Sequence, residues 1–132
     1  IVADAVMAGG GAVVGIITNE LMKREVGHTG VPDLRIVETM HERKKAMADL
    51  ARAFIALPGG VGTLDELFEI LAWRQLGIHQ CPIGILNTEG FYDDILRWID
   101  RANCEQFLRL DVDRALIVET DPERLLDKMA GR

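Results

Sequence analysis

The amino-acid sequence predicts an α/β fold in which a parallel sheet is flanked by helices. Short apolar runs alternate along the chain with longer segments that carry apolar residues at helical spacing, which is typical of parallel α/β proteins. The runs are rich in Val, Ile and Leu, as strands buried on both faces are. The chain has 132 residues, 48% of them hydrophobic and 27% charged, so it has the length and the apolar content of one globular domain.

Five apolar runs are predicted as strands and five periodic segments as helices. The predicted strands are Ala12–Ile17, Leu34–Val37, Ala53–Leu57, Ile83–Leu86 and Ala115–Val118. The predicted helices are Ile1–Ala8, Thr39–Arg52, Thr63–Gly77, Phe91–Asn103 and Pro122–Met129. Neither an internal repeat nor a long linker interrupts this series, so we expect residues 1–132 to form a single domain.

Two of the helices carry additional signals. Within Thr63–Gly77, apolar residues recur three and four positions apart between Leu64 and Leu71, which predicts one apolar stripe for packing on the sheet. Asp121 precedes Pro122, so the last helix is expected to begin with an acidic cap and with proline in its first turn.

Two further parts of the chain are informative, the segment Asn19–Asp33 and the start of the chain at Ile1. The segment Asn19–Asp33 is the longest predicted connection, and loops of this kind often contact ligands. The chain opens at Ile1 inside a predicted helix, so we expect part of the protein, including the first strands of the sheet, to precede it.

Charge and cysteine content exclude several classes of function. The chain has 15 Lys and Arg against 21 Asp and Glu, and its net charge of −6 argues against broad binding to nucleic acid or to anionic lipid. It contains no apolar run of about 18 residues, the length that spans a membrane. Cys81 and Cys104 are too few for a disulfide framework or a metal cluster, which favours a reducing compartment. We therefore expect a cytoplasmic protein that binds neither membrane nor nucleic acid.

The most informative segment is Ala53–Glu66, where an apolar strand runs into Gly59, Gly60 and Gly62 and then into a helix. Glycine lets the backbone approach a ligand closely, and the start of a helix offers unpaired N–H groups and a positive dipole end. Such a segment favours an anion, most often a phosphate. It has neither the Walker nor the dinucleotide-binding spacing, and a tight turn without a ligand is the alternative.

Thr63 and Glu66 fit a capping box, in which the Glu side chain reaches back to the Thr N–H group, and the residues alone favour this interpretation of Glu66. A carboxylate near a helix end that also holds phosphate would repel the phosphate, unless it faces a different part of the ligand. A sugar carbon that becomes cationic in the transition state would be such a part.

A second group of residues begins the helix predicted from Thr39. Its first turn follows the strand Leu34–Val37, and parallel strands present their carboxyl ends at one edge of a sheet, so Arg43 can meet the glycine segment. The guanidinium could grip a ligand or hold Glu66. The alternative is a solvated basic face. Met40 and Met47 are expected in the core or a pocket wall, and His41 at the surface.

Two segments follow each other in an order known from one family. They are Met40–Lys44 (Met-His-Glu-Arg-Lys) and Pro58–Glu66 (Pro-Gly-Gly-Val-Gly-Thr-Leu-Asp-Glu). They resemble the motif pair of the LONELY GUY family, the cytokinin riboside 5′-monophosphate phosphoribohydrolases, many of which have been labelled lysine decarboxylases. The resemblance extends through Trp73–His79 and Asn87–Tyr92 and backward through Val2–Ala5, so it covers most of the chain.

The resemblance implies a Rossmann-like nucleotide-hydrolase domain, usually a homodimer or a larger homo-oligomer. Its substrate is a small nucleoside monophosphate of the adenosine type, and cleavage of the N-glycosidic bond gives a free base, adenine or a cytokinin, and ribose 5-phosphate. Matched residue by residue, Arg43 and Glu66 fall on the catalytic pair. The expected substrate-binding residues are Glu25, Met40, Lys44, Gly59, Gly60, Val61, Gly62 and Thr63.

This implies that the glycine segment anchors the phosphate while Glu66 stabilises the oxocarbenium-like transition state and activates water. Arg43 would keep Glu66 ionised, and no residue is identified as the acid for the leaving base. We expect no cofactor, and the three histidines, His28, His41 and His79, lack metal-ligand spacing, so we expect no metal.

Three alternatives remain. The chain could be a non-enzymatic carrier of a nucleotide or of a molybdenum-type cofactor. It could be a decarboxylase, which would need pyridoxal phosphate and a Schiff-base lysine. It could also be a nucleosidase that accepts many nucleoside monophosphates. Ala72 and Cys81 stand where the family commonly has Thr and a basic residue, which leaves the preferred base open.

Overall fold

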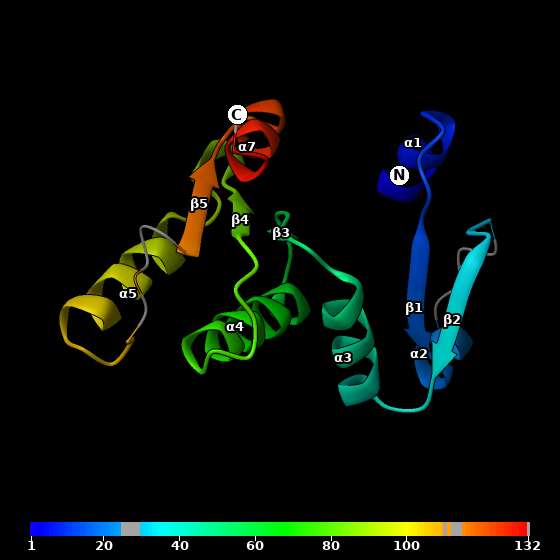
Figure 1. Ribbon diagram of the computed structural model, residues 1–132, viewed down its shortest axis with the longest axis horizontal. Helices are drawn as coiled ribbons and strands as arrows, with labels where there is room; N and C mark the ends of the chain where they lie inside the picture. Colours follow the sequence, from blue (N-terminus) through cyan, green and yellow to red (C-terminus); the bar gives the residue numbers. More distant parts are fainter. Residues whose placement is uncertain (25–29, 110, 112–114, 132) are drawn as a thin grey trace. The chain divides into compact units, whose positions relative to one another are not determined.

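Every strand pairing in the described part of the chain is parallel, and helices follow the strands (Figure 1). The predicted α/β fold with a parallel sheet architecture is therefore confirmed. The computed structural model describes residues 1–24, 30–109, 111 and 115–131. The chain divides into two compact units, Ile1–Leu50 and Ala51–Arg132, each with its own sheet. The expectation of a single domain stays a prediction.

The first unit contains a two-stranded sheet. Its elements are α1 (Val2–Ala8), β1 (Val14–Thr18), α2 (Asn19–Arg24), β2 (Asp33–Val37) and α3 (Met40–Leu50). In the register of the sheet, Val14 lies opposite Asp33 and Thr18 opposite Val37. Both strands therefore end at one edge, from which α2 and α3 start, and both helices pack against β1.

Helix α2 corrects the prediction that Asn19–Asp33 is a connection, because its first residues are helical. The Oγ1 atom of Thr18 accepts a hydrogen bond from the N–H group of Leu21 at 3.3 Å, and Arg24 pairs with Glu20 one turn earlier at 2.7 Å. Both contacts stabilise a single helical turn after the strand. Residues 25–29, and with them the predicted substrate contact Glu25, lie outside the described residues.

The second unit contains a three-stranded sheet in the order β3-β4-β5. Phe54 lies opposite Ile83, and Ile83 opposite Leu116. The elements are β3 (Phe54–Ala56), α4 (Val61–Gln75), β4 (Ile83–Leu86), the 3₁₀ turn η1 (Thr88–Gly90), α5 (Asp93–Cys104), β5 (Leu116–Glu119) and α7 (Pro122–Met129).

The central strand β4 forms the core of the second unit, with Ile83 and Ile85 fully buried. Helix α7 packs directly on this strand: a Cβ atom added to Gly84 would lie 2.5 Å from Sδ of Met129, so an alanine there would force the Met129 side chain to shift. From the other helices, α4 buries Leu67, Ile70 and Leu71. Asp121 caps α7 as predicted, accepting a hydrogen bond from the N–H group of Arg124 at 2.9 Å.

Burial on both faces holds for β4 but not for every strand. Ile36 of β2 is 52% exposed, and Val14 and Ile55 are also exposed, which corrects the expectation that all five apolar runs are buried on both faces. Strand β2 has a neighbouring strand on one side only within its unit.

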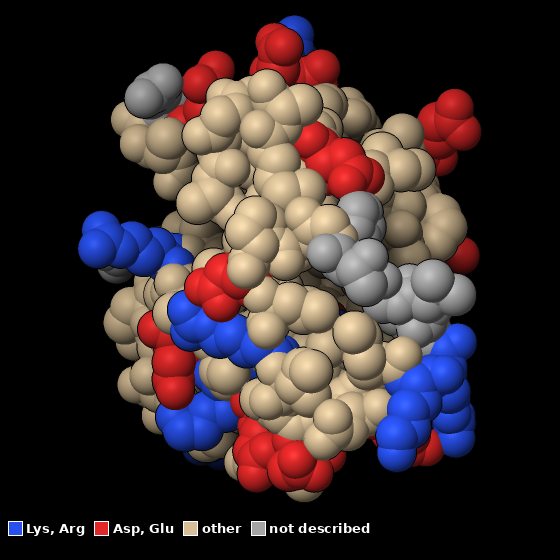
Figure 2. Space-filling model, turned by 90° about the vertical axis from the view of Figure 1, so that its right-hand side faces the viewer, with Lys and Arg blue, Asp and Glu red and all other residues tan. Residues whose placement is uncertain are grey.

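Charged side chains of both signs lie in scattered groups on a mostly uncharged face in Figure 2. Several form ion pairs one helical turn apart, such as Lys45 with Asp49 at 2.8 Å. Among the described residues, no helix combines the length and the apolar content needed to cross a bilayer.

Candidate functional site

The glycine segment joins β3 to α4. Strand β3 ends at Ala56, and Gly60 is the N-cap of the helix, with extended backbone angles of φ −91° and ψ −154°. The N–H group of Leu64 donates to the carbonyl oxygen of Gly60 at 3.2 Å, which is an α-helical hydrogen bond at the very start of α4. The helix therefore begins two residues before the predicted start at Thr63.

The predicted capping box of Thr63 and Glu66 is wrong for this reason. Thr63 already lies inside the first turn of α4, and the N-cap position is held by Gly60, which has no side chain to cap the helix. Glu66 lies in the second turn and is half-buried. The first turn contains no acidic residue, so no carboxylate there opposes an anion at the helix end.

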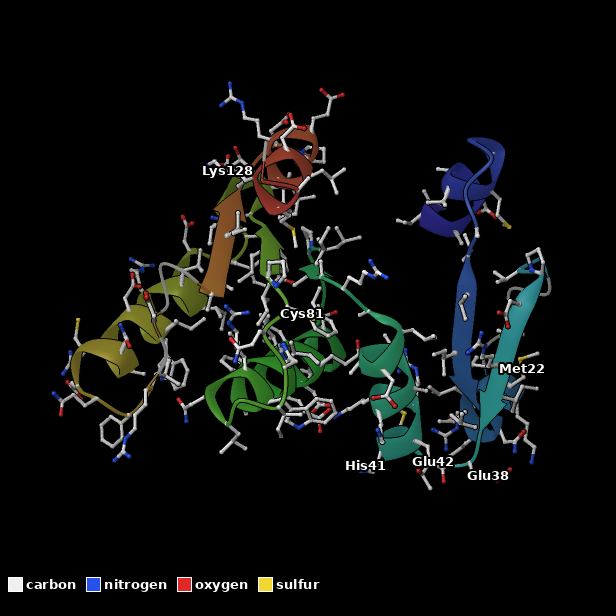
Figure 3. All side chains as sticks on the ribbon, in the orientation of Figure 1. Met22, Glu38, His41, Glu42, Cys81 and Lys128 are labelled. Carbon is white, nitrogen blue, oxygen red and sulfur yellow. The ribbon has the colours of Figure 1, made fainter. Side chains whose placement is uncertain are left out.

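A capping box forms instead at the start of α3. The N–H group of Glu42 donates to Oγ1 of Thr39 at 3.1 Å, and Oε2 of Glu42 accepts from the N–H groups of Thr39 and Glu38 at 3.3 and 2.9 Å. Glu38 and Glu42 lie together at this end of the helix in Figure 3. Asn19 donates from Nδ2 to Oε1 of Glu38 at 2.9 Å, which links this cap to the end of β1.

The three glycines of the segment differ in what surrounds them. A Cβ atom on Gly59 would lie 2.2 Å from Oγ1 of Thr63, so the fold itself requires glycine there. Within the described part of the chain, a Cβ atom on Gly60 or Gly62 would meet no atom within 4 Å apart from the adjoining main chain. Packing within the chain therefore explains Gly59 but not Gly60 or Gly62, and the backbone at these two positions is open to close approach from outside.

This open backbone coincides with the start of a 15-residue helix. The first N–H groups of a helix have no partner within it, and the aligned peptide dipoles place a partial positive charge at that end. No side chain caps this end in the described part of the chain, and Val61 beside it is 85% exposed. The segment Gly59–Thr63 therefore has the geometry and the electrostatics to hold an anion such as phosphate.

Arg43 does not belong to a solvated face. It is half-buried on α3, and its Nε atom donates to the carbonyl oxygen of Ile16 in β1 at 3.1 Å. By contrast, Lys45 is exposed and paired with Asp49, as the solvated-face alternative predicts. Lys44 is half-buried and His41 is exposed as expected.

Met40 and Met47 are 42% and 38% exposed, so neither is a core residue, and their expected place in a pocket wall stays a prediction. They lie in the first and last part of α3, whose residues are all exposed or half-buried, because only one side of this helix packs on the sheet of its unit.

The structure gathers the predicted residues into two sets. Gly59, Gly60, Val61, Gly62, Thr63 and Glu66 form one strand-to-helix segment of the second unit, and Met40, Arg43 and Lys44 lie on α3 of the first unit. The expectations that these sets share one edge and that Arg43 faces Glu66 stay predictions.

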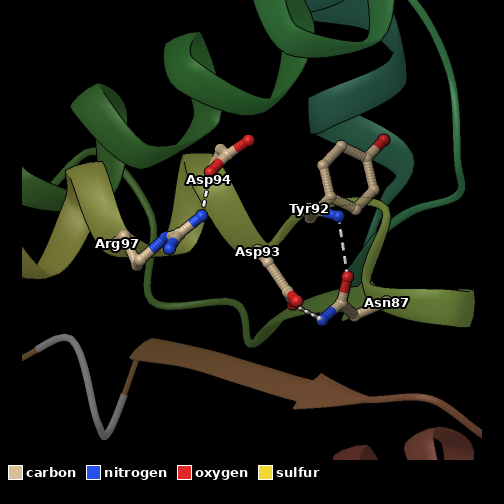
Figure 4. A network of polar contacts seen from close by, with 5 residues as sticks. All are labelled: Asn87, Tyr92, Asp93, Asp94 and Arg97. Atoms are coloured by element: carbon tan, nitrogen blue, oxygen red, sulfur yellow. Dashed lines mark hydrogen bonds and ion pairs between the residues drawn. The ribbon is translucent and has the colours of Figure 1, made fainter.

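The residue analysis missed two side chains that hold the glycine segment. The hydroxyl group of Tyr92 donates to the carbonyl oxygen of Leu57 at 2.5 Å, and the N–H group of Tyr92 donates to Oδ1 of Asn87 at 2.7 Å (Figure 4). Burial raises the pKa of Tyr92, while a hydrogen bond from the backbone of Gly59 acts in the opposite direction. A polar residue directly after the apolar run Ile83–Leu86 was the available signal.

Comparisons with known proteins relate the chain to one family. The sequence profile of a protein family described as "Possible lysine decarboxylase" matches residues 1–129. The chain is 49% identical over 129 residues to the cytokinin riboside 5′-monophosphate phosphoribohydrolase LOG of Oryza sativa subsp. japonica, covering 98% of this chain and 53% of the rice protein. It is 44% identical to the probable phosphoribohydrolase LOGL2 of the same plant, again with 98% and 53% covered.

The chain is also similar to a protein from a second plant. The cytokinin riboside 5′-monophosphate phosphoribohydrolase LOG4 of Arabidopsis thaliana is 43% identical over 129 residues, with 98% of this chain and 60% of that protein covered. The chain spans about half the length of the curated relatives that it matches first.

Proposed function

The chain belongs to the family described as possible lysine decarboxylases, and from this membership we propose that the whole protein hydrolyses the N-glycosidic bond of adenosine-type 5′-monophosphates, cytokinin nucleotides among them. The products are the free base and ribose 5-phosphate. One observation carries the proposal: Gly60 and Gly62 leave the backbone open at the start of α4, and Glu66 follows one turn later. An anion site and a carboxylate thus lie on one rigid element.

In this proposal the 5′-phosphate binds at Gly59–Thr63, where main-chain N–H groups and the helix dipole stabilise its charge. The ribose then extends toward Glu66. A carboxylate there stabilises the positive charge that develops at the anomeric carbon, and it orients or deprotonates the attacking water. The position of Glu66 in the second turn supports this division, because the first turn is left to the phosphate.

Arg43 is proposed as the second catalytic residue, on the strength of the motif that it shares with the family. Its anchoring to the carbonyl oxygen of Ile16 leaves little freedom to the guanidinium, as a role in orienting a carboxylate or a ligand requires. Met40, Lys44 and Val61 are proposed to contact the substrate, together with Glu25.

The decarboxylase label does not fit the described lysines. A Schiff-base lysine needs an amine in a desolvated pocket. Lys45 pairs with Asp49, and Lys128 pairs with Glu119, with side chains that are 62% and 58% exposed. Lys23 is also exposed, and Lys44 is half-buried beside Arg43 in the charged motif. None of these residues provides such an amine, so glycosidic hydrolysis is the better supported reaction.

The decisive experiment incubates the full-length protein with a panel of nucleoside 5′-monophosphates and measures the free base released. Release of adenine or of a cytokinin supports the proposal. A stoichiometric complex without release favours the carrier alternative, and equal turnover of every base favours the broad nucleosidase.

Substitution of Glu66 tests the mechanism. Glu66→Gln should preserve the fold while base release falls about 100-fold or more, the scale of a lost acid-base group. Asp65→Asn is the matched control, because it makes the same chemical change at an exposed position of the same helix. Equal activity in Glu66→Gln and wild type would show that Glu66 takes no part in the reaction.

Arg43→Ala should weaken both binding and rate, whereas Lys45→Ala, at an exposed ion pair on the same helix, should change neither. If Arg43 and Glu66 act together, the double variant should lose less activity than the product of the two single losses. If the two losses of activity simply multiply in the double variant, Arg43 and Glu66 act independently.

We further propose a cytoplasmic homodimer or larger homo-oligomer. Four of the large apolar side chains exposed in the second unit support this assembly, since association of subunits can remove such side chains from water. They are Leu76, Ile78, Trp98 and Phe107. Light scattering on the full-length protein measures the assembly, and a monomeric mass at working concentration would contradict it.

A further inference from the structure

A chain of hydrogen bonds crosses the carboxyl ends of all three strands in the second unit. It starts at β5, where the carbonyl oxygen of Glu119 accepts from the N–H group of Asn87 at 2.7 Å. Asn87 is 7% exposed; its Oδ1 atom accepts from the N–H group of Tyr92 at 2.7 Å, and its Nδ2 atom donates to Asp93 at 2.8 Å (Figure 4). Both ends of the Asn87 side chain are therefore bonded, and its orientation is fixed.

Tyr92 continues this chain to the glycine segment. Its side chain is 1% exposed, and its hydroxyl group donates to the carbonyl oxygen of Leu57 at 2.5 Å. One buried oxygen atom thus binds the main chain directly before Pro58 and Gly59, close in the chain to the open positions Gly60 and Gly62.

The glycine segment needs contacts that hold its main chain in one conformation. Glycine loses more conformational freedom on folding than any other residue, and no atom of another described residue lies within 4 Å of a Cβ built on Gly60 or Gly62, apart from the adjoining main chain. An anion site made of main-chain N–H groups works best when those groups are already oriented before the ligand arrives. The hydrogen bond from the Tyr92 hydroxyl group to Leu57 can hold the main chain of the glycine segment in one conformation.

We propose that Tyr92 is a positioning residue that fixes the main chain of Gly59–Gly62 for the phosphate of the substrate. This inference rests on the proposed function for the identity of the ligand, and on the hydrogen bond from the hydroxyl group to the carbonyl oxygen of Leu57 for the ordering itself. Tyr92 acts through the glycine segment and touches neither the sugar nor the base in this scheme.

The test uses Tyr92→Phe in the full-length protein, because this variant keeps the buried ring and its edge-to-face contact with Phe91 and removes only the hydroxyl group. Ile99→Val is the matched control. It removes one methylene group from a side chain that is 1% exposed in the same unit and makes no polar contact with the glycine segment.

Order parameters of the backbone N–H groups, measured by NMR relaxation without ligand, report the ordering directly. They should fall at Gly59–Gly62 in Tyr92→Phe, from about 0.85, typical of a rigid backbone, toward values below about 0.6, typical of a flexible one. They should stay unchanged in Ile99→Val. Unchanged order parameters in Tyr92→Phe, or an equal fall in both variants, would overturn the proposal whether or not the protein hydrolyses nucleotides.

Steady-state kinetics with adenosine 5′-monophosphate read the consequence for the ligand. KM should rise about tenfold in Tyr92→Phe while kcat changes less than about threefold, and Ile99→Val should leave both as in wild type. Lower order parameters with an unaltered KM would overturn the role in phosphate binding. Lower order parameters in a protein that releases no base would reject the proposed function and leave the ordering by Tyr92 established.

Discussion

The hydroxyl oxygen of Thr63 occupies the space that a side chain on Gly59 would need, 2.2 Å from the position of its Cβ atom. This contact joins the glycine segment to the first turn of α4. It separates a glycine required by packing within the chain from the two neighbouring glycines, around which space is open.

Gly59→Ala should destabilise the protein by about 1–3 kcal/mol, the range for overpacked sites, because the new methyl group collides with Thr63. Chemical denaturation measures the free energy of unfolding. In a Thr63→Ala background the same substitution should cost less, since the Oγ1 atom is gone, and an equal cost in both backgrounds would contradict the contact.

Gly62 gives the opposite expectation. It lies in the first turn of α4 with no atom within 4 Å of an added Cβ, and alanine is the better helix former by up to about 1 kcal/mol. Gly62→Ala should therefore raise the melting temperature. If phosphate approaches this backbone, the same variant should also raise KM for adenosine 5′-monophosphate, and a variant that gains stability with unchanged KM would place the phosphate elsewhere.

The capping box of α3 predicts a stability effect remote from the glycine segment. Thr39→Ala should lower the free energy of unfolding by about 1 kcal/mol, because the N–H group of Glu42 loses its acceptor. Thr39→Ser retains a hydroxyl group and should restore most of this loss. Equal stability of the Ala and Ser variants would show that the hydroxyl group contributes nothing.

The pKa of Tyr92 predicts a dependence on alkaline pH. Burial raises this pKa above its usual value of about 10, so the folded state holds the phenol proton more tightly than the unfolded state does. The contribution to stability is complete below pH of about 10 and is lost as pH rises through the folded-state pKa. Denaturation of wild type and Tyr92→Phe across this range should show a decline that is steeper in wild type, and parallel curves would contradict it.

The elements with strong local signals could be predicted from the sequence. Strand Ile83–Leu86 and helix Pro122–Met129 appear with the predicted bounds, because an uninterrupted apolar run and the pair Asp121 and Pro122 act within a few residues. Helix α2 was missed because its stabilising contacts, Thr18 with Leu21 and Glu20 with Arg24, span only one turn.

The site illustrates what local signals cannot decide. The pattern Thr-x-x-Glu occurs both at Thr39 and at Thr63, but it forms a capping box only at Thr39, since the chain enters α4 directly from β3 with Gly60 as the cap. Tyr92 escaped prediction because the residue to which its hydroxyl group donates, Leu57, lies 35 positions earlier in the chain. Such a pair becomes visible only when the strands are assembled.

The close approach of Met129 to Gly84 has a consequence for the chemical ageing of the protein. The thioether sulfur of this half-buried side chain lies against the central strand, and conversion to the sulfoxide would add a polar oxygen atom to that contact. Oxidation of Met129 would therefore weaken the packing of the C-terminal helix on the sheet of its unit.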